Sequence, residues 1–295
     1  MAGNLYLPKG YQQGKKYPAI ITVHPGGGVK EQTSGLYAKK LAERGFVTLA
    51  YDASHQGESE GLPRYLESPA DRVEDIRCAV DYLTTLPQVD PDKIAVVGIC
   101  AGGGYSISAA QTEHRIKAVA TVSAVDVGNI SRQGWDGKSG SVADQLKALE
   151  AIAAQRTAEA NGAPVRYDHI VPTKEEITAD TPRDIVEASE YYTEARGQYP
   201  TARNMSLFSH SDAIFAFHAF GDMETLLTQP ILLVAGTEAG SLWQSELAYQ
   251  KATAAASREL HRVNGATHME LYDVEKFVNP AADTIAAFLH KSLGA

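Results

Sequence analysis

Cysteine is scarce in this sequence: only Cys78 and Cys100 occur among 295 residues. Cys78 lies in the middle of a predicted helix and Cys100 lies at a turn between a strand and a helix, so the pair does not suggest a disulfide framework. Proteins built without disulfides are typical of reducing compartments. We therefore expect a cytoplasmic protein with two free thiols.

Basic clusters and long apolar runs are also missing. The chain has 27 Lys and Arg against 36 Asp and Glu, a net charge of −9, and this balance argues against a nucleic-acid partner because phosphate backbones attract positive charge. No apolar run approaches the roughly 18 residues of a membrane span, and the N-terminus lacks a basic segment followed by an apolar one. We expect neither a nucleic acid nor a membrane as a partner.

Spacings that hold metals or nucleotides are absent as well. His210 and His218 are eight residues apart, and no H-x-x-x-H or paired-cysteine spacing occurs. The glycine-rich turn around Cys100 fits neither G-x-G-x-x-G nor G-x-x-x-x-G-K-[ST]. We expect no metal and no cofactor.

Short apolar runs alternate with helical patterns over most of the chain, and 44% of its residues are hydrophobic. Runs bounded by turn signals predict buried strands at residues 18–24, 46–51, 94–99, 116–123, 230–235 and 260–263. Strands that alternate with helices at this spacing form βαβ units. The predicted fold class is therefore α/β, with a mostly parallel sheet and helices on both of its faces.

The alternation stops for about a hundred residues, which is far longer than the usual connections in such folds. Ser141 begins a capping-box helix that runs to about Ala160, and Pro182 opens another that stops at Gly197. We expect a core of residues 1–124 and 226–295 and a helical lid over the sheet, residues 125–225. The aromatic side chains of this insertion either pack beneath the lid or include two or three that line a substrate cavity.

Residues 98–102 read Gly-Ile-Cys-Ala-Gly and follow an apolar strand. This is the G-x-nucleophile-x-G pattern of a nucleophile elbow, with Cys100 at the strained apex and a glycine on each side to let strand and helix approach. The helix N-terminus favours a thiolate, the form that attacks carbonyl carbon. The alternative is that Cys100 is a small buried core residue.

Two further groups complete the predicted chemistry. His268 follows the last strand, so it falls at the carboxyl edge of the sheet, where it could accept the thiol proton and later activate water. An oxyanion hole needs two backbone N–H groups. Ala101 supplies one, and Gly26, with Gly27 in reserve, supplies the other from the glycine turn after residues 18–24.

The acid that should orient His268 is expected after the strand at residues 230–235. Glu238 is the only carboxylate before Glu246, so Glu238 is the candidate. The competing possibility is a Cys-His dyad, in which a backbone carbonyl or a water orients the ring.

Three segments of the sequence resemble the α/β-hydrolase superfamily, and within it the dienelactone-hydrolase-like and polyketide-transferase-like branch. They are HPGGGVKEQTSGLYAKKLAERGFVTLAYDASHQGESEG, RVEDIRCAVDYLTTLPQVDPDKIAVVGICAGGGY and GATHMELYD. The resemblance implies an α/β-hydrolase fold and a Cys-His-acid hydrolase or acyltransferase that acts on an ester, lactone or thioester without a cofactor. It also implies that Cys100 is the nucleophile, that His268 is the base, and that the HPGGG loop and Ala101 form the oxyanion hole.

The chain departs from that family in two respects. Members usually begin with a further strand, and they tend to carry an acid where this chain has Gly240. The leading hypothesis is a hydrolase that cleaves a small ester, lactone or thioester through an acyl-cysteine. An acyltransferase, in which an alcohol or amine replaces water, and a non-catalytic binding protein on the same scaffold are the alternatives. The expected partner is a small acyl substrate, and a homo-oligomer is left open.

Overall fold

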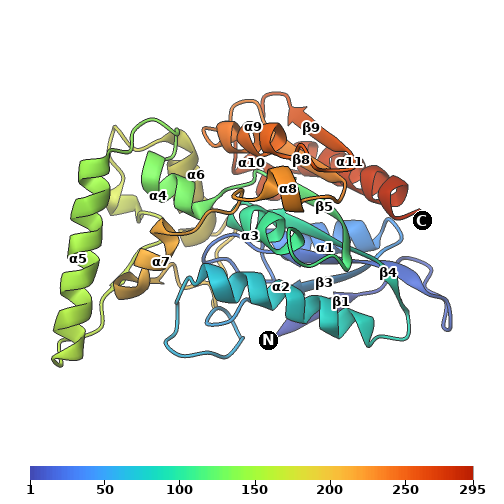
Figure 1. Cartoon of the computed structure of the whole chain (residues 1–295), viewed down its shortest axis with the longest axis horizontal. Coiled ribbons are helices and arrows are strands. Elements are labelled where there is room, and N and C mark those ends of the chain that lie inside the picture. Colours follow the sequence, from blue (N-terminus) through green and yellow to red (C-terminus); the bar gives the residue numbers. More distant parts are fainter. Residues whose placement is uncertain (295) are drawn as a thin grey trace.

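The central element is a seven-stranded sheet, seen in a computed structural model that describes residues 1–294. Its strands run in the order β1-β3-β2-β4-β5-β8-β9 (Figure 1). Only β1 is antiparallel to its neighbour, and every other pairing is parallel. The bounds are β1 Gly3–Tyr6, β2 Tyr17–Val23, β3 Val47–Tyr51, β4 Val89–Ile99, β5 Ile116–Val122, β8 Ile231–Gly236 and β9 Arg258–Val263. The predicted α/β-hydrolase fold, with a mostly parallel sheet, is confirmed.

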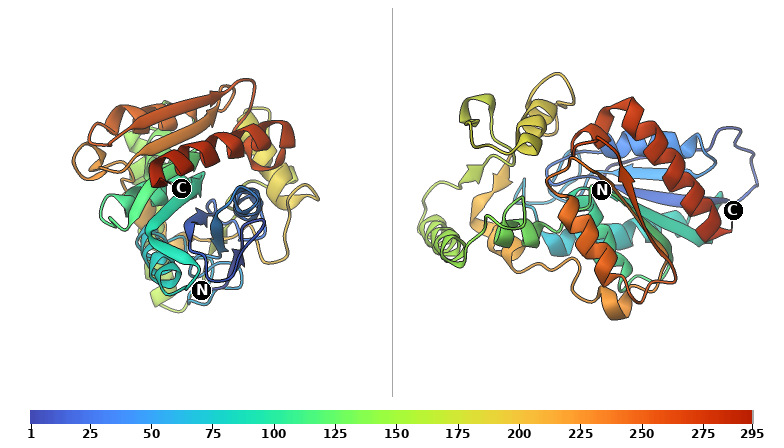
Figure 2. Two further views of the ribbon diagram at one scale, coloured as in Figure 1. Left: turned by 90° about the vertical axis from the view of Figure 1, so that its right-hand side faces the viewer. Right: turned by 90° about the horizontal axis from the view of Figure 1, so that it is seen from above.

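Helices cover both faces of the sheet because alternate residues of the central strands point to opposite sides. Ile20 packs in one core with α1 (Thr33–Ala42) and α11 (Glu275–Leu293). Its neighbour Ile21 packs in the other core, which α2, α3, α8 and α9 cover. Figure 2 shows α1 and α11 together on one side of the sheet. The helices on the opposite side are α2 Pro69–Thr84, α3 Ala101–Ala110, α8 Met223–Leu226 and α9 Leu242–Lys251.

The insertion (residues 125–225) begins after β5 and lies beyond one end of the sheet (Figure 1). Its longest helix, α5, is capped by Ser141, whose hydroxyl accepts a hydrogen bond from the Asp144 N–H at 3.1 Å. The other elements are short and leave long connections between them. The bounds are α5 Val142–Ala160 for the long helix, and α4 Val127–Gln133, β6 Tyr167–Asp168, η1 Lys174–Glu176, α6 Arg183–Thr193, β7 Ser206–Leu207, η2 Phe208–His210 and α7 Asp212–Phe215 for the others.

One helix end differs from the sequence prediction: helix α6 ends at Thr193 rather than at Gly197. Helix α11 begins at Glu275 and contains Pro280. Proline removes one helical N–H, but Pro280 is exposed, and water can satisfy the carbonyl that loses its partner.

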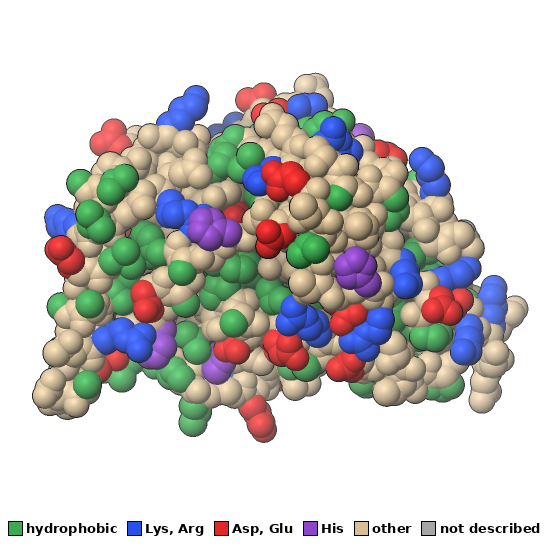
Figure 3. Space-filling model, viewed as in Figure 1, with side chains coloured by type: hydrophobic (Ala, Val, Ile, Leu, Met, Phe, Trp, Pro, Cys, Tyr) green, Lys and Arg blue, Asp and Glu red, His purple; other side chains and the backbone are tan. Residues whose placement is uncertain are grey.

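Acidic and basic side chains are interspersed over the face in Figure 3, without a large area of one sign. Among the helices of residues 1–294, none combines the length and the apolar character that crossing a bilayer requires.

Candidate active site

Cys100 stands at a sharp turn between β4 and α3, with φ 53° and ψ −123°. A non-glycine residue adopts this backbone only where its surroundings force it to. Here the forcing contact is a close approach of strand and helix: a Cβ on Gly98 would lie 2.2 Å from the Gly102 carbonyl oxygen, and one on Gly102 would lie 2.3 Å from the Val23 oxygen. The predicted elbow geometry is therefore present.

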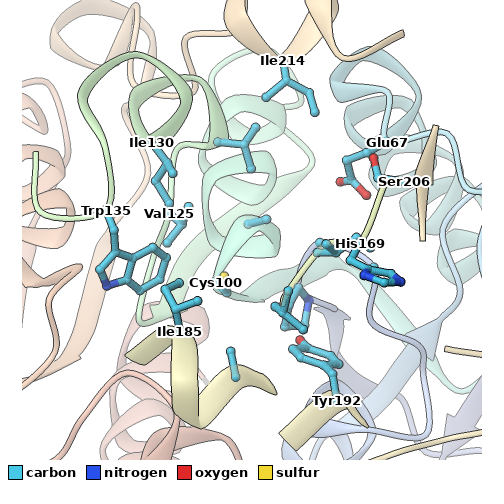
Figure 4. Close-up of a pocket in the computed structure, with 18 of the residues that line it drawn as sticks. Glu67, Cys100, Val125, Ile130, Trp135, His169, Ile185, Tyr192, Ser206 and Ile214 are labelled. Carbon is cyan, nitrogen blue, oxygen red and sulfur yellow. The ribbon is translucent and has the colours of Figure 1, made fainter. Parts of the chain in front are cut away.

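A cavity of about 390 Å³ opens above Cys100 and lies between the sheet and the insertion. Gly26, Gly27, Ala101 and His268 all line it, so the structure brings these predicted residues together. Figure 4 shows Cys100 in the middle of the lining side chains, with Val125 and Trp135 on one side and His169 on the other. Most of the lining is apolar, and the insertion contributes Val127, Ile130, Trp135, Ile185, Tyr192 and Ile214.

Buried polar groups hold the glycine loop beside Cys100. His24 accepts a hydrogen bond from the Ala53 N–H at its Nε2, which leaves Nδ1 to donate to the Pro25 oxygen at 2.7 Å. The Arg72 guanidinium donates to the His24 carbonyl oxygen. Burial, together with the nearby Arg72 charge, holds the pKa of His24 well below its usual value, so this ring is neutral and structural.

The thiol of Cys100 is protonated in the resting protein. Burial raises its pKa to about 11, and the nearby Tyr272 hydroxyl and Ala101 N–H, which favour the thiolate, only partly offset that effect. The expectation that the helix N-terminus yields a ready thiolate is wrong. Desolvation of the charged sulfur is the largest effect on this pKa.

His268 is also neutral at rest. Its side chain is only 1% exposed, and burial lowers its pKa to about 4 even though the charge of Asp184 favours the imidazolium. Nδ1 lies 2.6 Å from Ser241 Oγ, and Nε2 lies 3.3 Å from the Tyr272 hydroxyl. The tautomer with hydrogen on Nδ1, donated to Ser241, leaves a lone pair on Nε2 to accept a proton.

Tyr272 links the two groups. Its hydroxyl lies 3.3 Å from Nε2 of His268, and Tyr272 lines the same cavity as Cys100 and favours the charged form of its thiol. Sequence reasoning missed this residue although it lies in the GATHMELYD segment, in the helix α10 (Glu270–Asp273) that follows His268. The signal was an aromatic hydroxyl four residues beyond the histidine.

The structure does not bring Glu238 to His268. Glu238 is exposed at the end of β8, and within residues 1–294 the partner of Nδ1 is the hydroxyl of Ser241. A buried carboxylate that does reach His268 belongs to Asp184, on α6 of the insertion, whose Oδ1 lies 3.4 Å from the His268 backbone nitrogen. Within residues 1–294, no group of three or more His, Cys, Asp or Glu side chains is arranged to hold a metal ion.

Two protein-family models match the chain. The Dienelactone hydrolase family model matches residues 1–127, and the BAAT / Acyl-CoA thioester hydrolase C terminal model matches residues 73–192. Uncharacterized protein YcjY of Escherichia coli (strain K12) is 46% identical over 290 residues, which cover 98% of this chain and 93% of that protein.

Solved structures agree with these matches. Uncharacterized protein PA2218 of Pseudomonas aeruginosa is 37% identical over 99% of this chain and 77% of that protein. Its crystal structure matches with a TM-score of 0.88 at 36% identity, over 98% of this chain and 88% of that chain. The structure of the α/β hydrolase GrgF from Penicillium sp. sh18 matches with a TM-score of 0.76 at 20% identity, over 99% of this chain and 94% of that chain. This similarity supports the fold only. The chain thus belongs to the α/β-hydrolase superfamily, and it is a dienelactone-hydrolase-like enzyme that hydrolyses a carboxylic ester or thioester.

Proposed function

We propose that this enzyme cleaves a small ester, lactone or thioester through an acyl-cysteine intermediate. The observation that carries the proposal is the position of Cys100 at the apex of the turn, in one cavity with His268 and Tyr272, whose hydroxyl lies 3.3 Å from Nε2 of His268. Cys100 is the nucleophile, His268 the base, and Tyr272 the bridge between them. Gly26, Gly27 and Ala101 provide the oxyanion hole.

The first half of the reaction forms the acyl-enzyme. As sulfur attacks the carbonyl carbon, the thiol proton passes to the Tyr272 oxygen while the Tyr272 proton passes to Nε2 of His268. The new C–S bond moves an electron pair onto the carbonyl oxygen, which backbone N–H groups stabilise. When the bond to the leaving group breaks, the proton returns from His268 to the departing alcohol or thiol.

The second half repeats these steps with water. Water gives its proton to His268 and its oxygen attacks the acyl carbon, after which the C–S bond breaks and Cys100 regains the proton. Because both resting groups are neutral, charge develops only in the transition state, where the oxyanion hole and the Asp184 charge stabilise it. The net reaction consumes one water and releases one carboxylic acid.

The size and lining of the cavity suit a small acyl substrate. A volume of about 390 Å³ with mostly apolar walls favours a short hydrocarbon chain. Residues 125–225 act as a lid in this proposal, because α4, α6 and α7 all contribute side chains to the cavity over the core of residues 1–124 and 226–295. A cytoplasmic location fits the two free thiols.

Acylation of Cys100 is the direct test. After brief mixing with p-nitrophenyl hexanoate, intact mass should show one added hexanoyl group, and peptide mapping should place it on Cys100. The exposed Cys78 serves as the internal control because it shares the chain but not the cavity. Turnover of the ester with acylation of Cys78 alone, or of another residue, would contradict the proposal.

A further inference from the structure

We propose that Asp184 is a positioning residue for His268 and supplies, from the insertion, the carboxylate that the sheet lacks at Gly240. This inference rests on the proposed cysteine mechanism. It assigns the third member of the catalytic group to a segment 56 residues before Gly240 in the chain.

The Asp184 carboxylate is 3% exposed, and it joins the two loops that carry the histidine and its partner. Oδ2 accepts a hydrogen bond from the Gly240 N–H at 2.6 Å, and Oδ1 accepts one from the His268 N–H at 3.4 Å. Ser241 directly follows Gly240, and its Oγ meets Nδ1 of His268 at 2.6 Å. The carboxylate therefore fixes the distance between Ser241 and the imidazole ring through their backbones.

Asp184 also fills the space that a side chain at residue 240 would enter. A Cβ on Gly240 would lie 3.1 Å from Asp184 Oδ2 and 2.8 Å from Trp135 Nε1. Trp135, another residue of the insertion, donates to Oδ2 at 2.9 Å and packs its ring edge-on against His268 with centroids 5.0 Å apart. The insertion thus places both a carboxylate and an aromatic ring beside Gly240, in the loop that follows β8.

Two effects on His268 follow. The carboxylate contacts that hold the backbones of Gly240 and His268 together exist only while α6 packs at this end of the sheet. The negative charge favours the imidazolium that forms during the reaction, against the opposing effect of burial. Catalytic geometry is therefore coupled to the position of the insertion.

An exchange of the acid between the two sites tests this assignment. Asp184→Ala should lower kcat on p-nitrophenyl hexanoate on the order of tenfold or more, with KM changed less, because transition-state charge stabilisation is lost. In wild type, Gly240→Asp should also lower kcat, since it crowds a second carboxylate against the first. In the Asp184→Ala background the same Gly240→Asp change should raise kcat. This reversal of sign is not expected from a purely structural contact.

The control is Glu187→Gln, which removes a negative charge from the same helix. The Glu187 carboxylate accepts a hydrogen bond from the Thr267 hydroxyl at 2.6 Å and does not contact residue 240. It should keep kcat within about twofold. If Asp184→Ala does not fold, Asp184→Asn should still lower the pH of the acid limb of kcat/KM. Wild-type kcat in Asp184→Ala, or a Gly240→Asp effect of one sign in both backgrounds, would overturn the inference. If wild type forms no acyl-enzyme at Cys100, that result contradicts the proposed function instead.

A second, independent observation concerns the polar side of the cavity, and the geometry points to a substrate that carries a hydrogen-bond donor there. Glu67 is 8% exposed and lines the cavity. Its Oε1 accepts from the Tyr105 hydroxyl at 2.8 Å and faces Arg72 at 3.6 Å. Its other oxygen, Oε2, is buried and has no hydrogen-bond partner within residues 1–294.

Figure 4 shows how the two sides of the cavity differ around Cys100. Glu67 lies on one side with Ser206 and His169, and Val125, Ile130 and Trp135 lie on the other. A buried carboxylate oxygen without a partner is costly unless a ligand or water satisfies it. An ester with an apolar group at one end and a hydroxyl or ammonium group at the other satisfies both sides. This inference also rests on the proposed function.

Matched esters test this substrate class. One pair is p-nitrophenyl 6-hydroxyhexanoate and p-nitrophenyl hexanoate, and the other is 2-hydroxyethyl hexanoate and propyl hexanoate, so the hydroxyl is tried on each end. Wild type should prefer the hydroxylated ester of at least one pair by about tenfold in kcat/KM, which is typical of a hydrogen bond to a charged group. Glu67→Gln should reduce that preference severalfold, because its amide N–H₂ faces the cavity as a donor.

The control is Glu113→Gln, since Glu113 is buried to a similar degree and pairs with Arg115 away from the cavity. It should leave the preference unchanged. An equal preference in wild type and Glu67→Gln, or no preference in either pair, would rule out this substrate class. Failure of wild type to hydrolyse any of the four esters would contradict the proposed function instead.

Discussion

Replacing Cys100 with alanine should reduce ester hydrolysis by at least about a thousandfold, because removal of the nucleophile leaves only the oxyanion hole and substrate binding. The effect should appear in kcat rather than in KM, since the cavity walls remain. Steady-state kinetics on p-nitrophenyl hexanoate measure both parameters. Cys78→Ala is the matched control, because Cys78 is exposed on α2 and should lose less than about twofold.

Equal losses in the two alanine variants would contradict a specific role for Cys100. Cys100→Ser adds a further distinction: a hydroxyl needs a stronger base than a thiol, and the His268 pKa of about 4 makes this base weak. We therefore expect weak but measurable hydrolysis from the serine variant. Activity at the wild-type level would mean that the site is built for an oxygen nucleophile.

The sequence predicted the arrangement of the core because its signals are local. Ile20 and Ile21 lie in a continuous apolar run, which is the pattern of a strand covered on both faces. The glycines on both sides of Cys100 likewise predicted a close approach of strand and helix, and the Gly98 and Gly102 contacts explain why. His268 followed from its place after the last strand.

The acid could not be predicted in the same way. Glu238 is the carboxylate closest in sequence to the end of β8, but nearness in sequence does not determine where a side chain points, and this one is exposed. Asp184 reaches the same place from α6, through an insertion whose position no local pattern specifies. The high pKa of Cys100 could not be predicted either, because it results from burial, and insertion residues distant in sequence surround Cys100 in the folded protein.

Replacing His268 with asparagine should lower kcat/KM by about 10²–10⁴-fold, the contribution typical of general acid–base catalysis. Asparagine can hydrogen-bond Ser241 or Tyr272, but it cannot take up the proton that leaves the thiol. Rates measured from pH 4 to pH 9 on one ester, with melting temperatures to show that the variant folds, test this expectation.

The pH profile of wild type gives an independent check on the same base. Only the neutral imidazole accepts the thiol proton, so kcat/KM should fall as the pH drops through the folded pKa of about 4, and the profile should stay flat through pH 6.5. In His268→Asn this acid limb should disappear. Iodoacetamide should alkylate Cys100 slowly at pH 7, and the rate should rise about tenfold per pH unit, because the thiol pKa is about 11. Fast alkylation at pH 6 would instead indicate a preformed thiolate–imidazolium pair. A neutral pair places the whole cost of charge separation in the transition state, and for that reason removing the proton acceptor has so large an expected effect.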